Sequence, residues 1–293
     1  MHTHRPALTV FTGRTADRNE RGMAGSLVVG LALARRLGLE PARIGEPEAP
    51  FAGGWREQLT AASSWLRCLS AHYDALLRDG NTPLLTTMGR CASALATLPL
   101  VARYRPDAAI VWFDAHGDCN TPSTSSSGYL GGLVLTGAAG RWETDWKDNT
   151  GLGGDLDLAN VILVGARDLD PAERALIDAG TIALVPTGDG LPERLRSAIA
   201  GREVYVHLDC DVLNPGIVPT EYAVDGGLSL DDLSTAAQVL ADCGLIGLEI
   251  AEFEIGWSGD WADRKRLEGS PETCSPDALL DALAPLLASP DRA

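Results

Sequence analysis

The sequence predicts one α/β domain of three layers, in which helices cover both faces of a mostly parallel sheet. Short apolar runs of strand length alternate along the chain with longer segments whose apolar residues recur at helical spacing. No linker or internal repeat interrupts this alternation, so we expect a single domain over residues 1–293. Acidic residues directly follow several of the predicted strands, and folds of this class bind their ligands at that edge of the sheet.

The predicted strands are short apolar runs that turn signals bound on one or both sides. They cover residues 7–12, 42–44, 83–88, 108–113, 160–164, 182–185, 203–208 and 245–250. The segments between them carry apolar residues three or four positions apart, as amphipathic helices do. We expect helices over residues 19–37, 55–77, 92–105, 191–200, 229–241 and 275–287, with two more that begin near 129 and at 171. Gly38 fits a helix end, Pro171 a first helical position and Ser229 an N-cap.

Composition narrows the class of function. The chain is 45% hydrophobic and 22% charged, as globular proteins usually are, and its formal charge of -16 disfavours nucleic acid and anionic membrane surfaces as partners. No apolar run of 18 residues predicts a membrane span, and the N-terminus lacks the apolar segment of a secretory signal. Six scattered cysteines without metal-finger spacing favour reduced thiols and a cytoplasmic location.

The strongest chemical signal follows the strand predicted over residues 108–113. Asp114, His116 and Asp118 stand at alternate positions, so their side chains point toward one side of the strand end. Two neighbouring carboxylates repel each other and are costly to bury, and a divalent cation resolves both problems. The alternative is a solvated polar loop. Asp, His and Asp form a ligand set suited to Mn, Fe, Co or Zn.

The same pattern recurs at other predicted strand ends. Asp209 and Asp211 follow the strand over residues 203–208, Cys91 follows another strand, and Glu252 ends a third. Four carboxylates, a thiolate and an imidazole carry too much negative charge for one ion. Two divalent cations about 3.5–4 Å apart would balance them, and metal binding lowers the pKa of water to roughly 7. The residues therefore predict hydrolysis at a dinuclear metal centre.

Four segments resemble motifs of the ureohydrolases, the superfamily of arginase and agmatinase. Residues 114–122 resemble the signature D-A-H-x-D-x-N-T-P, and residues 208–215 resemble the second metal motif F-D-x-D-x-x-D-P. Residues 165–173 are similar to G-x-R-D-x-D-P-x-E, and residues 247–252 match the strand that ends in a guanidinium-binding Glu. The resemblance implies the arginase fold and two Mn²⁺ ions per chain, with Zn, Fe or Co as alternatives.

The resemblance also implies a role for each matching residue. Asp118 would both bind metal and orient the attacking hydroxide, and Glu252 would pair with the guanidinium group of the substrate. The implied manganese ligands are Asp114, His116, Asp118, Asp209 and Asp211.

Five further residues match positions that contact the amino-acid end of the substrate. Asn120 and Ser127 would hold the α-carboxylate and Asp170 the α-amino group, with weaker contacts from Ser125 and Asp168. The alternative for the two serines is a flexible polar loop. For Asp170 the alternative is helix capping beside Pro171.

Two departures from the family pattern bear on the substrate. Cys91 replaces the metal-binding His of the motif G-G-D-H-S, which reads Met-Gly-Arg-Cys-Ala over residues 88–92. A thiolate is a competent ligand that would favour Zn or Fe, whereas the alternative is a buried structural Cys beside a weakened metal site. Gly131 replaces the His that serves arginases as a proton shuttle. General acid catalysis contributes roughly 10²–10⁴-fold, so we expect arginine hydrolysis to be impaired.

Together these departures resemble the Nω-hydroxy-L-arginine hydrolases of D-cycloserine biosynthesis, an antibiotic pathway. An N-hydroxyguanidine is less basic than a guanidine, and its hydrolysis would give L-ornithine and hydroxyurea. The alternatives are hydrolysis of arginine or another guanidino acid, or a catalytically silent protein that binds metal and ligand. The expected partner is a small guanidino amino acid, and the short segment after residue 287 favours a monomer.

Overall fold

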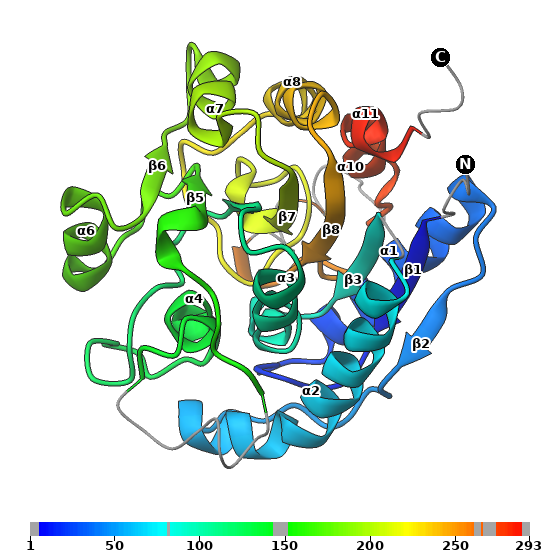
Figure 1. Cartoon of the computed structure of the whole chain (residues 1–293). Coiled ribbons are helices and arrows are strands. Elements are labelled where there is room, and N and C mark those ends of the chain that lie inside the picture. The colour runs from blue at the N-terminus through cyan, green and yellow to red at the C-terminus, as the bar shows by residue number, and fades with distance from the viewer. Residues whose placement is uncertain (1–5, 81–82, 143–151, 261–264, 266–273, 289–293) are drawn as a thin grey trace.

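The computed structural model describes residues 6–80, 83–142, 152–260, 265 and 274–288. They form the predicted α/β domain around an eight-stranded sheet with the strand order β2-β1-β3-β8-β7-β4-β5-β6. Every strand pairing within these ranges is parallel, which agrees with the alternation of strands and helices in the sequence. Figure 1 shows the strands passing between two groups of helices.

The strands match the expected runs to within one or two residues at each end. They are β1 (Ala7–Phe11), β2 (Ala42–Ile44), β3 (Leu84–Met88), β4 (Ala109–Phe113), β5 (Val161–Val164), β6 (Ala183–Val185), β7 (Val204–Asp209) and β8 (Leu245–Ala251). The central strands β3, β4, β5 and β7 are buried along their whole length, as expected of a sheet covered on both faces.

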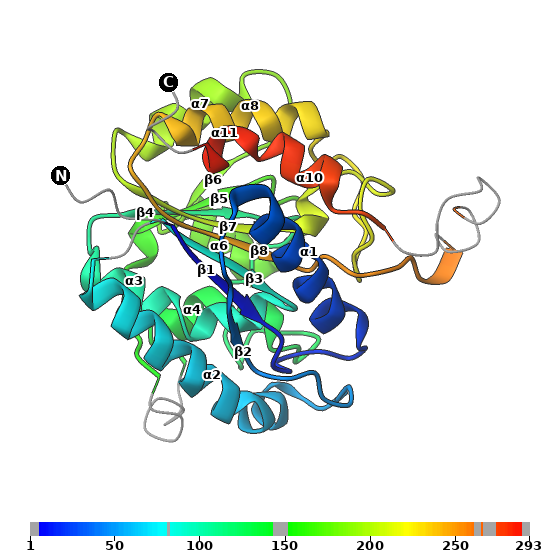
Figure 2. The same ribbon diagram turned by 90° about the vertical axis from the view of Figure 1, so that its right-hand side faces the viewer.

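Helices cover the two faces in two groups (Figure 2). One group packs its apolar residues with one core cluster and comprises α2 (Trp55–Arg78), α3 (Leu98–Tyr104), α4 (Val134–Ala138) and α6 (Pro171–Asp178). The other group packs with the second cluster and comprises α1 (Arg21–Leu37), α7 (Leu191–Ile199), α8 (Leu230–Ala241), α10 (Asp277–Ala282) and α11 (Ala284–Leu287). The three-layer prediction is therefore confirmed. No helix within the described ranges has the length and apolar character to span a membrane.

Two predicted helices are divided, and proline accounts for both divisions. The helix expected over residues 92–105 is a 3₁₀ helix, Cys91–Leu95, followed by α3, which has Pro99 in its first turn. The helix expected over residues 275–287 is split into α10 and α11, and Pro285 stands in the first turn of α11. Proline has no amide hydrogen to continue a preceding helix, so it is tolerated mainly in a first turn.

The strand order brings distant parts of the chain to one edge of the sheet. Strands β3, β8, β7 and β4 are neighbours, although they come from residues 84–88, 245–251, 204–209 and 109–113. Because the strands are parallel, their carboxyl ends all open on the same edge. The last residue of β7 is Asp209, and the segments that follow the four strands contain the other five predicted metal ligands and Glu252.

Helix α1 lies unusually close to the segment after β8. A Cβ atom on Gly25 would overlap the backbone carbonyl of Phe253, the residue that follows Glu252. Only glycine allows this approach, which sets the position of α1 against the end of β8.

We predict that Gly25→Ala lowers the free energy of unfolding by about 3 kcal/mol, because the added methyl group must displace backbone rather than a flexible side chain. Urea denaturation followed by circular dichroism measures the change. Gly132→Ala is the matched control, since a Cβ atom there meets nothing within 4 Å. Equal stability of the two variants would contradict the close packing of α1.

Candidate metal and substrate site

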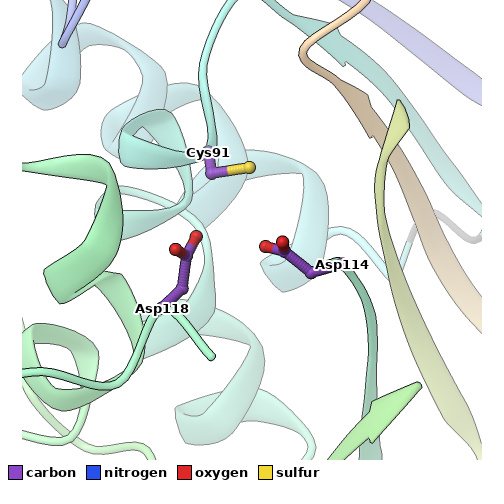
Figure 3. Close-up of side chains that lie close together, drawn as sticks. All are labelled: Cys91, Asp114 and Asp118. Atoms are coloured by element: carbon purple, nitrogen blue, oxygen red, sulfur yellow. The ribbon is translucent and has the colours of Figure 1, made fainter. Parts of the chain in front are cut away.

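Potential metal ligands gather at the carboxyl edge of the sheet. Figure 3 shows the side chains of Cys91, Asp114 and Asp118 converging on one space, and their ligand atoms lie within 4.8 Å of one another. Two further groups meet the same criterion among the described residues, namely Cys91 with Asp209 and Glu252, and Asp114 with His116 and Asp211. The six residues predicted as metal ligands therefore lie in three overlapping groups, which fits more than one cation.

Local hydrogen bonds fix the carboxylates in place. The backbone amide of His116 and the indole of Trp112 donate to Asp114, at 2.7 and 3.0 Å. The amide of Asp211 donates to Asp209 at 2.7 Å, and the amide of Ala115 donates to Asp211 at 3.0 Å. The bond from Ala115 to Asp211 joins the ends of β4 and β7, so the pairing of these strands helps to set the spacing of the acidic side chains.

Two of the acidic residues have strained backbones. Asp118 and Glu252 adopt φ angles of 48° and 62°, in the left-handed region that residues other than glycine rarely occupy. Such conformations cost free energy and persist where the surroundings hold them, most often at functional sites. These are the two residues predicted to act in catalysis, and the strain is independent support for that prediction.

Burial of so much negative charge shifts the acid–base equilibria. Burial, and then repulsion from Asp114, raise the pKa of Asp118 well above its ordinary value. Burial and the neighbouring Asp211 do the same for the pKa of Asp209. Burial raises the pKa of Glu252 to about 7, although the positive charge of Arg90 opposes the shift. Without added cations these groups favour their protonated forms, so the cluster suits divalent cations.

His116 supplies the one imidazole of the cluster. Its Nδ1 atom lies 3.2 Å from Asp114 and 3.1 Å from Asp211, between the two carboxylates. Burial disfavours the imidazolium, but hydrogen bonds to both carboxylates dominate and raise the pKa of His116. The same three side chains could bind a cation together, because their ligand atoms lie within 4.8 Å of one another.

Cys91 contacts a second imidazole. Its Sγ atom lies 3.0 Å from Asp209 and 3.2 Å from Nε2 of His207, a buried residue on β7. Nδ1 of His207 is 2.7 Å from Glu249, and the ring stacks on Trp112 at a centroid distance of 3.6 Å. The sequence analysis does not identify His207 as a residue of the site. Its alternation with Asp209 along the strand is the signal that could have identified this contact.

Arg90 is the main residue that the sequence analysis missed. Its side chain is fully buried, and its guanidinium lies 2.7 to 3.3 Å from the carboxylates of Asp17, Glu221, Glu252 and Glu254. The amide of Cys91 donates to the second oxygen of Glu252 at 2.9 Å, so both oxygens of Glu252 have protein partners. Arg90 stands where the motif G-G-D-H-S has Asp, and this reversal of charge was the available signal.

A cavity of about 270 Å³ opens beside the cluster. Its wall contains eleven of the twelve predicted site residues, with Asp114 lying just outside it: Cys91, His116, Asp118, Asn120, Ser125, Ser127, Asp168, Asp170, Asp209, Asp211 and Glu252. Tyr129, Gly131 and Tyr222 also line the cavity. The cavity therefore joins the predicted metal ligands to the predicted substrate contacts in one space.

The end of the cavity away from the cluster is polar. The amide of Asn120 donates to Asp170 at 2.9 Å. Asp170 is the N-cap residue of α6 and forms a capping box with Glu173, whose side chain accepts the amide of Asp170 at 3.0 Å. Asp170 also lines the cavity, so its position is compatible with both substrate binding and helix capping. Ser125 and Ser127 accept backbone amides of the loop that follows them.

Comparisons with known proteins agree with the motifs. Residues 48–254 match the model of the arginase family. The chain is 34% identical to N(omega)-hydroxy-L-arginine amidinohydrolase from Streptomyces lavendulae over 278 residues, which is 95% of this chain and 96% of that protein. It is 29% identical to arginase from Bacillus caldovelox over 188 residues, 61% of this chain and 62% of that protein.

Solved structures agree with the fold. The native crystal structure of Bacillus caldovelox arginase covers 97% of this chain and 98% of its own length, with a TM-score of 0.78 and 23% identity. This likeness shows the fold, and the family match together with the Streptomyces relative shows the family. The chain therefore belongs to the arginase family of ureohydrolases.

Proposed function

We propose that this chain is a dinuclear metal hydrolase that cleaves the guanidino C–N bond of Nω-hydroxy-L-arginine, giving L-ornithine and hydroxyurea. The observation that carries the proposal is the convergence of Cys91 and its acidic neighbours on one cavity, in a chain 34% identical over nearly its whole length to a hydroxyarginine amidinohydrolase. We further propose manganese as the metal, a cytoplasmic location and a monomeric state. Zinc, iron and cobalt are the alternative metals.

The metal ligands in this proposal are Cys91, Asp114, His116, Asp118, Asp209 and Asp211. Their chemistry fits two divalent cations, since carboxylates, an imidazole and a thiolate are all competent ligands and their buried charges repel one another without cations. When bound, such a pair of cations polarises the substrate and lowers the pKa of water to about 7. Asp118 holds and orients the attacking oxygen through a hydrogen bond.

The remaining residues bind and orient the substrate. Glu252 receives the guanidino end, and Asn120 with Ser127 receives the α-carboxylate at the other end of the cavity, with Ser125 as a weaker contact. Asp170 pairs with the α-ammonium, with Asp168 as a weaker contact. The presence of both Asp118 and Glu252 argues against a catalytically silent binder, because a protein that only binds has no need of a carboxylate that orients a hydroxide.

Elemental analysis of the purified protein should find close to two metal ions per chain, and Cys91→His should retain both because imidazole is a ligand of equal competence. Cys91→Ala should lose about one ion. Cys68→Ser is the control, because Cys68 is an exposed residue of α2. One ion or none in the unsubstituted protein would exclude the dinuclear mechanism.

The stability of the metal-free protein should fall as pH rises. Native Glu252 has its pKa raised from 4.5 to about 7, so the folded state holds a proton that the unfolded state has lost over that interval. The raised pKa values of Asp118 and Asp209 act in the same direction. With chelator present, the melting temperature should therefore be lower at pH 8 than at pH 5.5.

Manganese competes with these protons, so the same measurement should show a larger rise in melting temperature on adding Mn²⁺ at pH 8 than at pH 5.5. Thermal denaturation followed by circular dichroism, with and without the metal, gives all four values. A metal-free protein that is more stable at pH 8 would contradict the assignment of buried, mutually repelling carboxylates.

Turnover of the two candidate substrates should differ strongly. We expect kcat/KM for Nω-hydroxy-L-arginine to exceed that for L-arginine by about 100-fold or more, because Gly131 provides no general acid and the less basic substrate needs less protonation. Release of L-ornithine, measured by amino-acid analysis, serves for both substrates. Equal or greater turnover of arginine would support the runner-up function, an arginase in which water replaces the shuttle side chain.

A further inference from the structure

Two buried rings lie next to the candidate metal site. Trp112 on β4 and His207 on β7 stack face to face, with ring centroids 3.6 Å apart and planes 5° apart. They are direct partners in the parallel pairing of these strands, so the register of the sheet places one ring against the other. Each ring stands two residues before a predicted metal ligand, Asp114 or Asp209, and therefore points to the same side of the sheet as that ligand.

Each ring also contacts a predicted metal ligand directly. The indole of Trp112 donates to Asp114 at 3.0 Å, and Nε2 of His207 lies 3.2 Å from Sγ of Cys91. Cys91 and Asp114 belong to one ligand group, which Asp118 completes. The stacked pair therefore contacts two ligands of the same group and constrains where they lie relative to each other.

The ring of His207 is itself held in one orientation. Its Nδ1 atom lies 2.7 Å from the carboxylate of Glu249 on β8, which also accepts hydrogen bonds from the hydroxyls of Tyr205 and Thr97, at 2.6 and 2.5 Å. With Trp112 against its face and Glu249 at Nδ1, the ring keeps Nε2 directed at the sulfur. Outer partners of this kind fix the orientation of metal ligands and help to set the affinity for the metal.

The sulfur of Cys91 needs a partner that fixes its position. A cysteine side chain has one rotatable bond to the sulfur, with three staggered positions about it. Figure 3 shows the sulfur facing the space that it shares with Asp114 and Asp118, and in this position it meets Nε2 of His207. Contact with the fixed ring therefore favours the rotamer that a metal ligand requires.

We propose that His207 is a positioning residue that holds the sulfur of Cys91 in place to bind a divalent cation. The inference rests on the proposed function and deepens it, since it explains how a cysteine serves where the family motif has a metal-binding His. Loss of His207 weakens the cation that Cys91 binds. The ligand group of Asp114, His116 and Asp211 does not include Cys91, so the second cation stays bound.

Titration of the chelator-treated full chain with Co²⁺ tests the proposal, because a thiolate bound to cobalt gives a sulfur-to-cobalt charge-transfer band in the near ultraviolet. The amide of asparagine can replace Nδ1 of histidine, and the amide of glutamine can replace Nε2. His207→Asn therefore loses the contact with the sulfur, and we expect the affinity for the ion that produces the band to fall about 10- to 100-fold. His207→Gln keeps the contact, so its affinity should change less than about 3-fold.

Tyr205→Phe is the matched control. It removes a buried hydrogen bond to the same carboxylate from the same strand, but the hydroxyl of Tyr205 bonds to Glu249 and Tyr73 rather than to the sulfur. Its affinity for cobalt should stay within about 2-fold of that of the unsubstituted protein. Cys91→Ser should lack the band, which assigns the band to this thiolate. Circular dichroism establishes that each variant is folded, and His207→Phe, which keeps a ring against Trp112, replaces His207→Asn if the latter does not fold.

Unchanged affinity and an unchanged band in His207→Asn would overturn the proposal. An equal loss in Tyr205→Phe would also overturn it, since that result indicates a general effect on the core. Absence of the band from the unsubstituted protein would exclude both this inference and the assignment of Cys91 as a metal ligand. Failure to turn over either candidate substrate would refute the proposed function alone, because the cobalt titration does not depend on catalysis.

Discussion

Buried negative charge at the carboxyl edge of the sheet is the constraint on which the rest of the site depends. Asp114, Asp118, Asp209, Asp211 and Glu252 are each less than a tenth exposed, and burial works against the ionised form of every one of them. The chain opposes this cost with backbone amides, an imidazole placed between two carboxylates and a buried guanidinium. The negative charge that remains fits divalent cations. The same buried carboxylates thus account for the electrostatics of the site and for its proposed chemistry.

Backbone geometry shows how strongly the surroundings hold the site. Asp118 and Glu252 come from different strand ends, and both are kept in a left-handed conformation. Glu252 accepts hydrogen bonds on both carboxylate oxygens. Helix α1 packs against the next residue, Phe253, at Gly25, where the absence of a side chain permits the close approach. The free energy for this strain comes from the packed sheet and helices, which hold each carboxylate at a fixed angle to the cavity.

Much of the fold and of the site could be predicted from the sequence. An apolar run that is followed by acidic residues at alternate positions predicts both a strand and a site at its end. The site follows because side chains two positions apart point the same way. Strand order cannot be read in this manner, and it is the adjacency of β3, β8, β7 and β4 that unites Cys91 with Asp209. The contacts of Arg90 and His207 also stayed hidden, since each depends on side chains brought together by tertiary packing.

Arg90 has a consequence for how the cavity opens. Its four acidic partners belong to three segments: the loop after β1 carries Asp17, the loop after β7 carries Glu221, and the segment after β8 carries Glu252 and Glu254. Moving any one segment outward would leave a buried guanidinium short of a partner, so this wall resists local unfolding. The polar loop over residues 121–128 also borders the cavity and carries none of these partners of Arg90. Local opening is therefore cheaper in this loop, and ligand exchange should follow that route.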